Sequence, residues 1–274
     1  MTNRRQTIGA ALILLAALCV LPKHFLVTPI RWDFIRAYGA DVFLIFRPST
    51  VTAHAGEYVL LAVMGLAAWG IGCLLLRLLA SATSFLSNWA ARLLIGLGVL
   101  SHLLFLFAAL QILNRTAISV LLRIGCLAGI VELARVRWFE LKKKLAEWIA
   151  DRPRSPDGMV LLVVAFFLIA CSFFSSLLPP TQSDALRYHL TTPRIWLEHG
   201  GFCRIPNISF SNFPMTIDIL YAVPLAYGLP SVAKLLHWSF LIAALGMVYR
   251  IGTVLSGRTA ARLGVLLFVS IPFV

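Results

Sequence analysis

Apolar positions along the chain gather into long runs, and short polar stretches separate one run from the next. Several runs approach or exceed the roughly 20 residues that an α-helix needs to cross a bilayer. Such runs exclude an outer-membrane barrel, whose strands show short alternating segments. The pattern therefore predicts an all-α, polytopic helical membrane protein with about six full spans. The predicted spans are residues 8–25, 58–80, 89–112, 117–133, 158–178 and 231–251.

The first and last apolar runs differ from the rest. The run at 8–25 follows Arg4 and Arg5 and lacks an A-x-A-like cleavage site, which favours a membrane helix over a signal peptide. The last run, at 263–274, offers about twelve residues and is too short to cross. We read it as a truncated seventh span. We therefore expect the chain to be a fragment of a longer protein, with later loops missing.

Composition agrees with a membrane protein and limits the kinds of partner that we expect. Hydrophobic residues make up 60% of the chain, charged residues 13%, and mean hydropathy is +0.89. The net charge of +13 would suggest nucleic acid in a soluble protein, but lysine and arginine also collect in cytoplasmic loops. No nucleic-acid partner is expected. The five cysteines are scattered without a CxxC, so the sequence indicates neither a metal site nor a disulfide framework. No cofactor is expected.

Residues 134–157 form the most basic stretch, with seven lysines or arginines against four acidic residues. Their apolar positions recur at three- and four-residue steps, which predicts an amphipathic surface helix. The positive-inside rule places this stretch and the N-terminus in the cytoplasm, in a multi-pass protein of the cell (inner) membrane. The stretch divides the chain into a four-span region (1–133), a linker (134–157) and a C-terminal module (158–274).

Short or charged segments complicate the span pattern in several places. Residues 22–56 mix charged and aromatic side chains, which suits an outside loop lying partly in the membrane interface. Residues 215–227 are too short to span and are broken by Pro224, so we expect an interfacial helix. Arg123 lies inside the fourth span and is expected to face protein or to reach toward an interface. Spacing assigns no partner to Glu132.

The longest polar interruption in the C-terminal half covers residues 178–213, on the periplasmic or outer face by the same charge rule. Ser183 followed by Asp184 predicts a helix start, because serine caps free N–H groups and an acidic first turn suits the helix dipole. Pro193 is expected either to kink this helix or to begin a second one. A polar stripe would face an aqueous cavity. It holds Asp184, Arg187, Tyr188, Thr191, Ile195 and Glu198 at three- and four-residue spacing.

The same residues also have plainer interpretations, and spacing leaves both kinds open. Asp184 fits a capping charge that is paired with Arg187 in a solvated loop. His189 and His199 fit interfacial surface residues. The aromatic side chains of this region fit an interfacial belt, and they are Tyr188, Trp196 and Tyr221.

The C-terminal module carries, in order, the segments PPTQSDALRYH, WLEHG, SNFP and SGRTAARLGVLLFVSIP. This order resembles the membrane-embedded glycosyltransferases of the C superfamily, above all the bacterial relatives of the dolichyl-phosphate-mannose–protein mannosyltransferases. The resemblance covers residues 158–274. It implies a large multi-span helical fold, a sugar donor carried on a polyprenyl phosphate, and transfer on the outer face of the membrane.

In that family an acidic residue of the first outer loop serves as general base or orients the acceptor, and by position this is Asp184. A carboxylate suits the task, because the acceptor hydroxyl must lose its proton as the anomeric carbon is attacked. Arginines would steady the departing lipid phosphate. Many relatives carry Asp-Glu here, whereas this chain has Ala185, so a paired-carboxylate role is not carried over. The expected substrate-binding residues are Arg187, Tyr188, His189, Arg194, Glu198 and Asn212.

The resemblance thus predicts a membrane glycosyltransferase whose partners are a polyprenyl-phosphate sugar donor, the lipid bilayer and an unknown acceptor. A second hypothesis is a non-catalytic polytopic protein, either part of a transporter or an assembly partner. A transporter would show broken helices and charged residues at mid-membrane depth, and Arg123 is an isolated candidate.

Overall fold

The computed structural model describes residues 52–79, 89–135, 156–178 and 182–271, with the isolated positions 142, 146 and 180. The chain divides into two compact units, Met1–Ala53 and His54–Val274, and the helices given below belong to the second. The span predicted at 8–25, nearly all of the loop at 22–56 and most of the linker at 134–157 lie outside the described residues.

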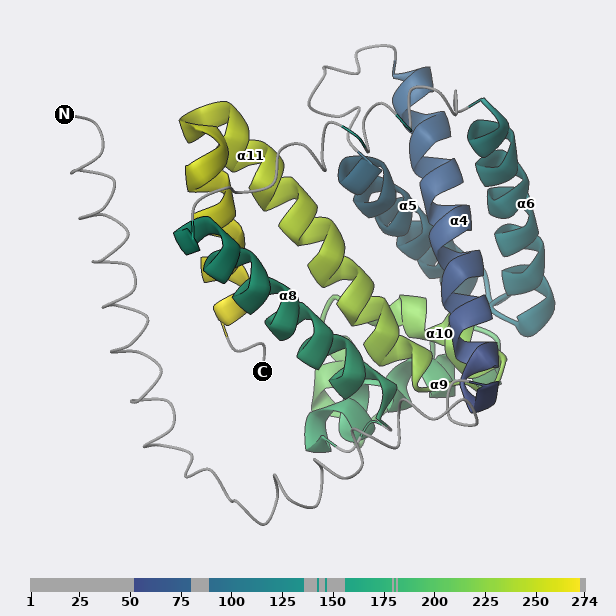
Figure 1. Ribbon diagram of the computed structural model, residues 1–274. Helices are drawn as coiled ribbons and strands as arrows, with labels where there is room; N and C mark the ends of the chain where they lie inside the picture. Colours follow the sequence, from purple (N-terminus) through teal and green to yellow (C-terminus); the bar gives the residue numbers. More distant parts are fainter. Residues whose placement is uncertain are drawn as a thin grey trace. The chain divides into compact units, whose positions relative to one another are not determined.

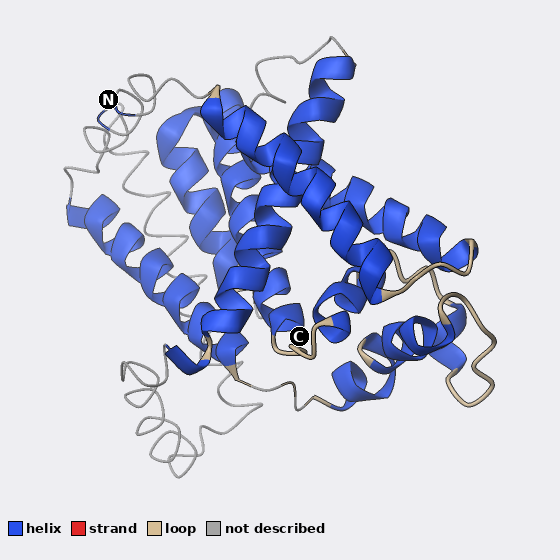
Figure 2. Ribbon diagram, turned by 90° about the vertical axis from the view of Figure 1, so that its right-hand side faces the viewer, coloured by secondary structure: helices blue, strands red, loops and turns tan. Residues whose placement is uncertain are grey.

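The described residues form helices and the loops that join them, without a strand (Figure 2). Five of these helices are long and apolar enough to cross a membrane. A helix can enter lipid because it pairs its backbone N–H and C=O groups internally. The prediction of an all-helical fold is thereby confirmed for the described residues, and the length and apolar composition of these five helices support a membrane protein. The five helices are α4 (Ala55–Leu78), α5 (Trp89–Ala109), α6 (Arg115–Ala134), α8 (Pro156–Leu177) and α11 (Val232–Ser270).

The predicted spans agree well with the first four of these helices, whose ends differ from the predicted ones by about three residues or fewer. The short connection between α5 and α6 ends at Asn114, the N-cap residue of α6. Its side-chain oxygen accepts a hydrogen bond from the backbone N–H of Ala117 at 2.9 Å and caps α6. The fifth helix, α11, combines the predicted sixth span with most of the apolar run that follows it.

α11 folds back at Gly257, which has a φ of 83° and a ψ of 177°. Glycine tolerates this positive φ because it has no Cβ. A Cβ built at Gly252 would lie 2.7 Å from the Cα of Ala261, whereas nine residues of straight helix would separate them by about 13 Å. The two arms of α11 therefore pack against each other. The reversal falls in the polar turn between the predicted sixth span and the next apolar run.

α4 lies between α5 and α6, and glycines allow the three helices to approach closely (Figure 1). A Cβ at Gly96 of α5 would overlap the carbonyl oxygen of Ala68 on α4. A Cβ at Gly70 of α4 would overlap the backbone of Gly129 on α6. Small residues promote such packing in membranes, where burying apolar surface gives helices no advantage over lipid. These contacts hold α5 and α6 against α4, and so set where the side chains at the helix ends lie.

α8 and α11 form a second pair, and α11 also packs against α5 and α4. Trp238 of α11 donates its ring N–H to the carbonyl of Ile169 on α8 at 3.3 Å. Lys234 of α11 donates to the carbonyls of Ser175 and Leu178 at 2.7 and 3.0 Å. The lysine thus satisfies carbonyls that the end of α8 leaves without helical partners.

The segment at 215–227, predicted as an interfacial helix, is helical in part and mostly packed against other helices, with Thr216 and Ile217 exposed. It contains a short 3₁₀ helix, η3 (Asp218–Tyr221), followed by α10 (Ala222–Ala226). Ile219 and Leu220 of η3 are at most 1% exposed, and η3 packs against α5. The segment has a single charged residue, Asp218, which suits its packing against other helices.

Candidate functional site

The loop predicted at 178–213 contains three short helices between α8 and α11, namely η1 (Ala185–His189), α9 (Thr191–His199) and η2 (Ser209–Asn212). Ser183 and Asp184 are both helical, so a helical segment begins where the sequence predicts one, but the cap position Asp184 makes no side-chain capping hydrogen bond. η1 is a π-turn, in which the N–H of Leu190 donates to the carbonyl of Ala185 at 3.0 Å. Single π-turns are rare and are frequent at functional sites.

The sequence left open whether Pro193 kinks a helix or begins a second one. It is the third residue of α9, so it lies in the first turn of a second helix rather than at a kink. A proline in this turn loses no intrahelical hydrogen bond, because the first N–H groups of a helix have no partner. Trp196 of α9 is 5% exposed, and its ring meets Phe202 edge-on at 4.7 Å. It therefore belongs to the core and not to an interfacial belt.

A largely buried carboxylate is paired with a histidine in this region. His189 Nδ1 lies 3.0 Å from Asp218 Oδ1, and the two side chains are 41% and 14% exposed. Burial raises the pKa of the Asp218 carboxyl, and the neighbouring His189 opposes that shift. With Nδ1 held by the carboxylate, the other ring nitrogen of His189 has no hydrogen-bond partner among the described residues. It is placed to accept a proton from a ligand.

A second polar pair lies beside the first. The hydroxyl of Tyr221 and the imidazole of His237 on α11 are hydrogen-bonded. Burial, and then the negative charge of Asp218, raises the pKa of Tyr221. Asp218 also acts electrostatically on His237, so the four groups form one cluster. We call it the His–Asp site, and its members are His189, Asp218, Tyr221 and His237.

Aromatic rings border the His–Asp site. The ring of Tyr188 lies 4.2 Å from that of His189 and stacks on Phe210 at 4.7 Å, between ring centroids. Phe210 meets Phe213 at 5.4 Å, and both phenylalanines are exposed. Exposed apolar rings beside a polar pair give a surface that suits an amphipathic ligand.

The other predicted site residues lie at the surface of the same loop. Asp184 is exposed, makes no capping hydrogen bond and has no ion-pair partner among the described residues, so its suggested pairing with Arg187 is not formed. Arg194 pairs instead with Glu198 at 3.5 Å, with both side chains more than half exposed. Asn212 is exposed and donates to a carbonyl within η2.

The structure thus brings two of the predicted residues, Tyr188 and His189, to the His–Asp site. The sequence analysis did not predict three members of this site, namely Asp218, Tyr221 and His237. One signal for Asp218 was available, because it is the only acidic residue after Glu198. A lone carboxylate in an apolar segment is costly and therefore points to a function.

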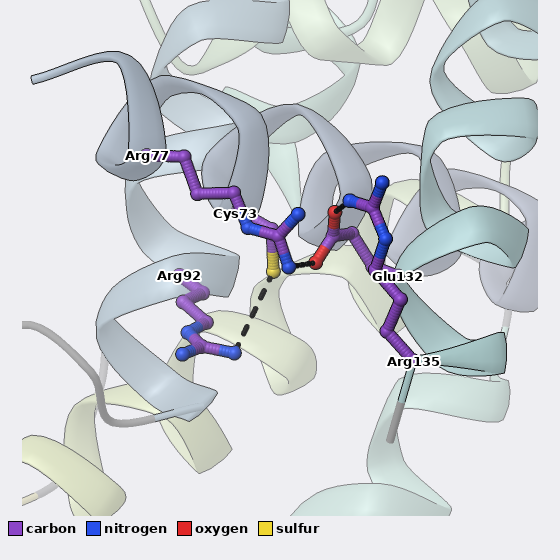
Figure 3. Close-up of polar contacts among 5 residues, drawn as sticks. All are labelled: Cys73, Arg77, Arg92, Glu132 and Arg135. Carbon is purple, nitrogen blue, oxygen red and sulfur yellow. Dashed lines mark hydrogen bonds and ion pairs between the residues drawn. The ribbon is translucent and has the colours of Figure 1, made fainter. Parts of the chain in front are cut away.

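The opposite end of the α4–α5–α6 bundle carries a separate polar cluster (Figure 3). Glu132, to which the sequence assigned no partner, pairs with Arg77 of α4 at 2.5 Å and with Arg135 at 2.9 Å. Its side chain is 8% exposed. Arg92 of α5 donates to the sulfur of Cys73 on α4 at 3.8 Å. We call these five residues the arginine cluster.

Arg123 of α6 belongs to neither cluster. Its side chain is exposed on the described part of the protein, so the expectation that it faces protein is not met there. Exposed apolar side chains flank it, including Val120, Ile124 and Leu127. An arginine on such a helix face would reach along its stem toward an interface.

Comparisons of the chain with protein-family models, with curated proteins and with solved structures return no match. Within the ranges that the structure describes, no group of three or more His, Cys, Asp or Glu side chains could hold a metal ion. The described polar side chains offer two kinds of chemistry. These supply an acid–base pair at one end of the bundle and fixed positive charge at the other.

Proposed function

We propose that the protein is a membrane glycosyltransferase, which transfers a sugar from a polyprenyl-phosphate donor to an acceptor hydroxyl. The resemblance of residues 158–274 to the C superfamily supports the reaction class. The observation that carries the proposal is the pairing of His189 with Asp218. It puts an acid–base pair in the same region as Asp184, the residue that the resemblance selects.

Proton removal is the step that this pair suits. An acceptor hydroxyl has a pKa far above neutral, so it must lose its proton as it attacks the anomeric carbon. Asp218 holds Nδ1 of His189, which favours the tautomer whose other nitrogen accepts a proton. The carboxylate also stabilises the imidazolium that forms. In this proposal His189 accepts the acceptor's proton, and Asp184, exposed at the start of the same helical segment, orients the acceptor.

The leaving group needs positive charge. As the sugar departs, the polyprenyl phosphate regains negative charge, and a guanidinium stabilises it with charge-assisted hydrogen bonds. Arg187 is exposed within η1, two residues from His189. Arg194 is a weaker candidate, because Glu198 already pairs with it. Tyr188 and the exposed Phe210 would contact the apolar parts of the donor.

In this proposal the positive charge of the linker sets the orientation of the protein in the membrane. The basic linker at 134–157 would lie in the cytoplasm, and the His–Asp site would face the periplasm or cell exterior. The donor would reach the site from the bilayer. The substrate-binding residues of the proposal are Arg187, Tyr188, His189, Arg194, Glu198 and Asn212.

The test is sugar transfer by the purified protein in liposomes that contain labelled polyprenyl-phosphate sugars and a membrane-extract acceptor. His189→Gln is expected to lower turnover by about 100-fold or more, as the loss of general base catalysis does. Asp184→Asn is expected to lower it by about the same factor, because the acceptor is no longer held in position. His199→Gln is the matched control, since His199 is exposed and its Nδ1 is hydrogen-bonded to the carbonyl of Ile195 in its own helix. Its turnover is expected to equal the wild type's.

Two results would overturn the proposal. Unchanged turnover in both Asp184→Asn and His189→Gln would remove the catalytic assignment of this loop. No transfer by the wild-type protein from any polyprenyl-phosphate sugar, with the protein folded by circular dichroism, would favour the non-catalytic alternative.

A further inference from the structure

The arginine cluster has no role in the proposed reaction, since it lies at the opposite end of the α4–α5–α6 bundle. We infer that it binds the phosphate group of an anionic membrane lipid, and that Arg92 is the main phosphate ligand. The argument rests on the unequal partners of the three arginines, on their excess charge and on their place at the helix ends.

Arg92 has a much poorer partner than a guanidinium ordinarily finds. A guanidinium carries five N–H donors, and a thiol is a weak acceptor. The side-chain contact of Arg92 with a described residue is the sulfur of Cys73 at 3.8 Å. Arg92 is nevertheless only partly exposed, so water does not surround it. A half-buried cation with unused donors is a site for an anion.

Glu132 does not neutralise the cluster. Its two oxygens are taken by Arg77 and Arg135, one oxygen each. The five side chains include three guanidinium groups and one carboxylate, which leaves an excess of two positive charges. Arg77 and Arg135 are 50% and 57% exposed, so each keeps N–H groups free for a further acceptor. The carboxylate therefore orients two of the arginines.

The backbone around Arg92 is held in place by helix packing. A Cβ at Gly72 of α4 would overlap the carbonyl oxygen of Arg92, so the two helices touch at this point. Figure 3 shows the guanidinium of Arg92 pointing to the sulfur of Cys73 and that of Arg77 pointing to Glu132. The thiol lies within electrostatic reach of both guanidinium groups. A phosphate beside Cys73 would thus meet arginines from two helices.

The position along the helices favours a lipid over a free anion. Arg77 lies in the last turn of α4, Arg92 in the first turn of α5, and Arg135 directly after α6. All three helices are candidate spans, so these ends lie at head-group depth. The sequence continues from Arg135 into the basic linker, which adds further positive charge to this side. Basic pockets between spans are a recurrent means of binding lipid phosphates.

The experiment is native mass spectrometry of the full-length protein in a neutral detergent. Phosphatidylglycerol and phosphatidylcholine with identical acyl chains are titrated separately, and inorganic phosphate is added in a third arm. The wild type is expected to retain phosphatidylglycerol in preference. Arg92→Gln is expected to weaken that binding about fivefold, the effect of one arginine near a charged head group.

Two control variants separate the site from general charge and from folding. Cys73→Ala removes the thiol and leaves the guanidinium, so phosphatidylglycerol binding should persist. Arg115→Gln removes a cation from the other end of the bundle, where Arg115 lies over the ring of Tyr227, and it should leave lipid binding unchanged. Wild-type melting temperatures in all three variants would show that folding is intact.

Three outcomes would overturn the inference. Equal retention of the two lipids by the wild type would remove the preference for an anionic head group. Wild-type binding in Arg92→Gln would remove Arg92 as a ligand. Displacement of the lipid by inorganic phosphate at millimolar concentration would show an anion site that does not recognise lipid.

Discussion

The two ends of the helix bundle each hold a buried carboxylate, and each carboxylate has a basic partner of a different kind. At one end Asp218 is paired with His189 at 3.0 Å. At the other end Glu132 is paired with Arg77 and Arg135 at 2.5 and 2.9 Å. Both carboxylates are less than 15% exposed. The burial is similar, and the chemistry of the partner differs.

The difference separates a site that can exchange protons from one that cannot. An imidazole titrates near neutral pH and can pass a proton to or from a ligand. A guanidinium stays charged at any physiological pH and can only bind or steady an anion. We therefore assign the proposed acid–base chemistry to the Asp218 end and anion binding to the Glu132 end.

The largest effect is expected where α4 and α5 touch, because this contact supports both ends. In Gly96→Ala the new methyl group overlaps the backbone of Ala68, and a backbone cannot move aside as a side chain can. We expect a loss of about 3 kcal/mol in the free energy of unfolding. In Gly98→Ala the methyl group meets nothing within 4 Å, so this matched variant should be as stable as the wild type or slightly more stable. Equal thermal unfolding of the two variants would contradict the close helix contact.

A smaller loss is expected from Glu132→Gln. The variant removes a charge-assisted hydrogen bond to each of two arginines, but both are half exposed and can turn toward solvent. The expected cost is about 1–2 kcal/mol, measured by thermal unfolding in detergent. Phosphatidylglycerol binding should strengthen, because the cluster then carries one more net positive charge. The control is Glu198→Gln, which breaks an exposed pair and should cost about 0.5 kcal/mol or less. Equal losses of unfolding free energy in the two variants would mean that the buried ion pairs of Glu132 stabilise the protein no more than an exposed pair does.

The sequence was sufficient for the helices, because a bilayer-length apolar run leaves a chain few alternatives. The runs that became α4, α5, α6 and α8 show this. The sequence also indicates the turn at Gly257, since a polar segment separates two apolar ones. Local rules suffice where the interacting residues are neighbours in sequence, as at Asn114, whose side chain caps α6.

The two polar clusters could not be predicted in the same way. His189 and Asp218 are 29 residues apart, and Arg77 and Glu132 are 55 residues apart. Which residues meet over such distances depends on the rotation and close approach of whole helices, as at Gly70. Part of the second cluster was readable, since Arg135 follows Glu132 by three residues on one helix face. The packing of η3 against α5 could not be predicted for the same reason.

The pH dependence of stability sharpens the contrast between the ends. Burial raises the pKa of Asp218, so just above the ordinary carboxyl range the folded protein binds more protons than the unfolded chain. Stability contributed by this group therefore falls as pH rises from about 4 through the raised pKa. Asp218→Asn should remove that slope, which melting curves across this range would reveal. In His189→Gln the slope should extend to higher pH, because the group that lowers the pKa is gone. Parallel curves for the wild type and Asp218→Asn would contradict the assignment.

The smallest effect on stability is expected from Asp184→Asn, and its smallness is informative. Asp184 is exposed and has no hydrogen-bond or ion-pair partner in the ranges that the structure describes, so its folded and unfolded surroundings differ little. The free energy of unfolding should change by about 0.5 kcal/mol or less. The proposed function nevertheless requires a large loss of turnover in the same variant. A carboxylate that matters for transfer and not for folding must act on a ligand, whereas Asp218 and Glu132 also act on their own protein. If Asp184→Asn lowered the melting temperature as far as Glu132→Gln does, Asp184 would be a carboxylate that stabilises the fold. It would then not differ from Asp218 and Glu132 in this respect.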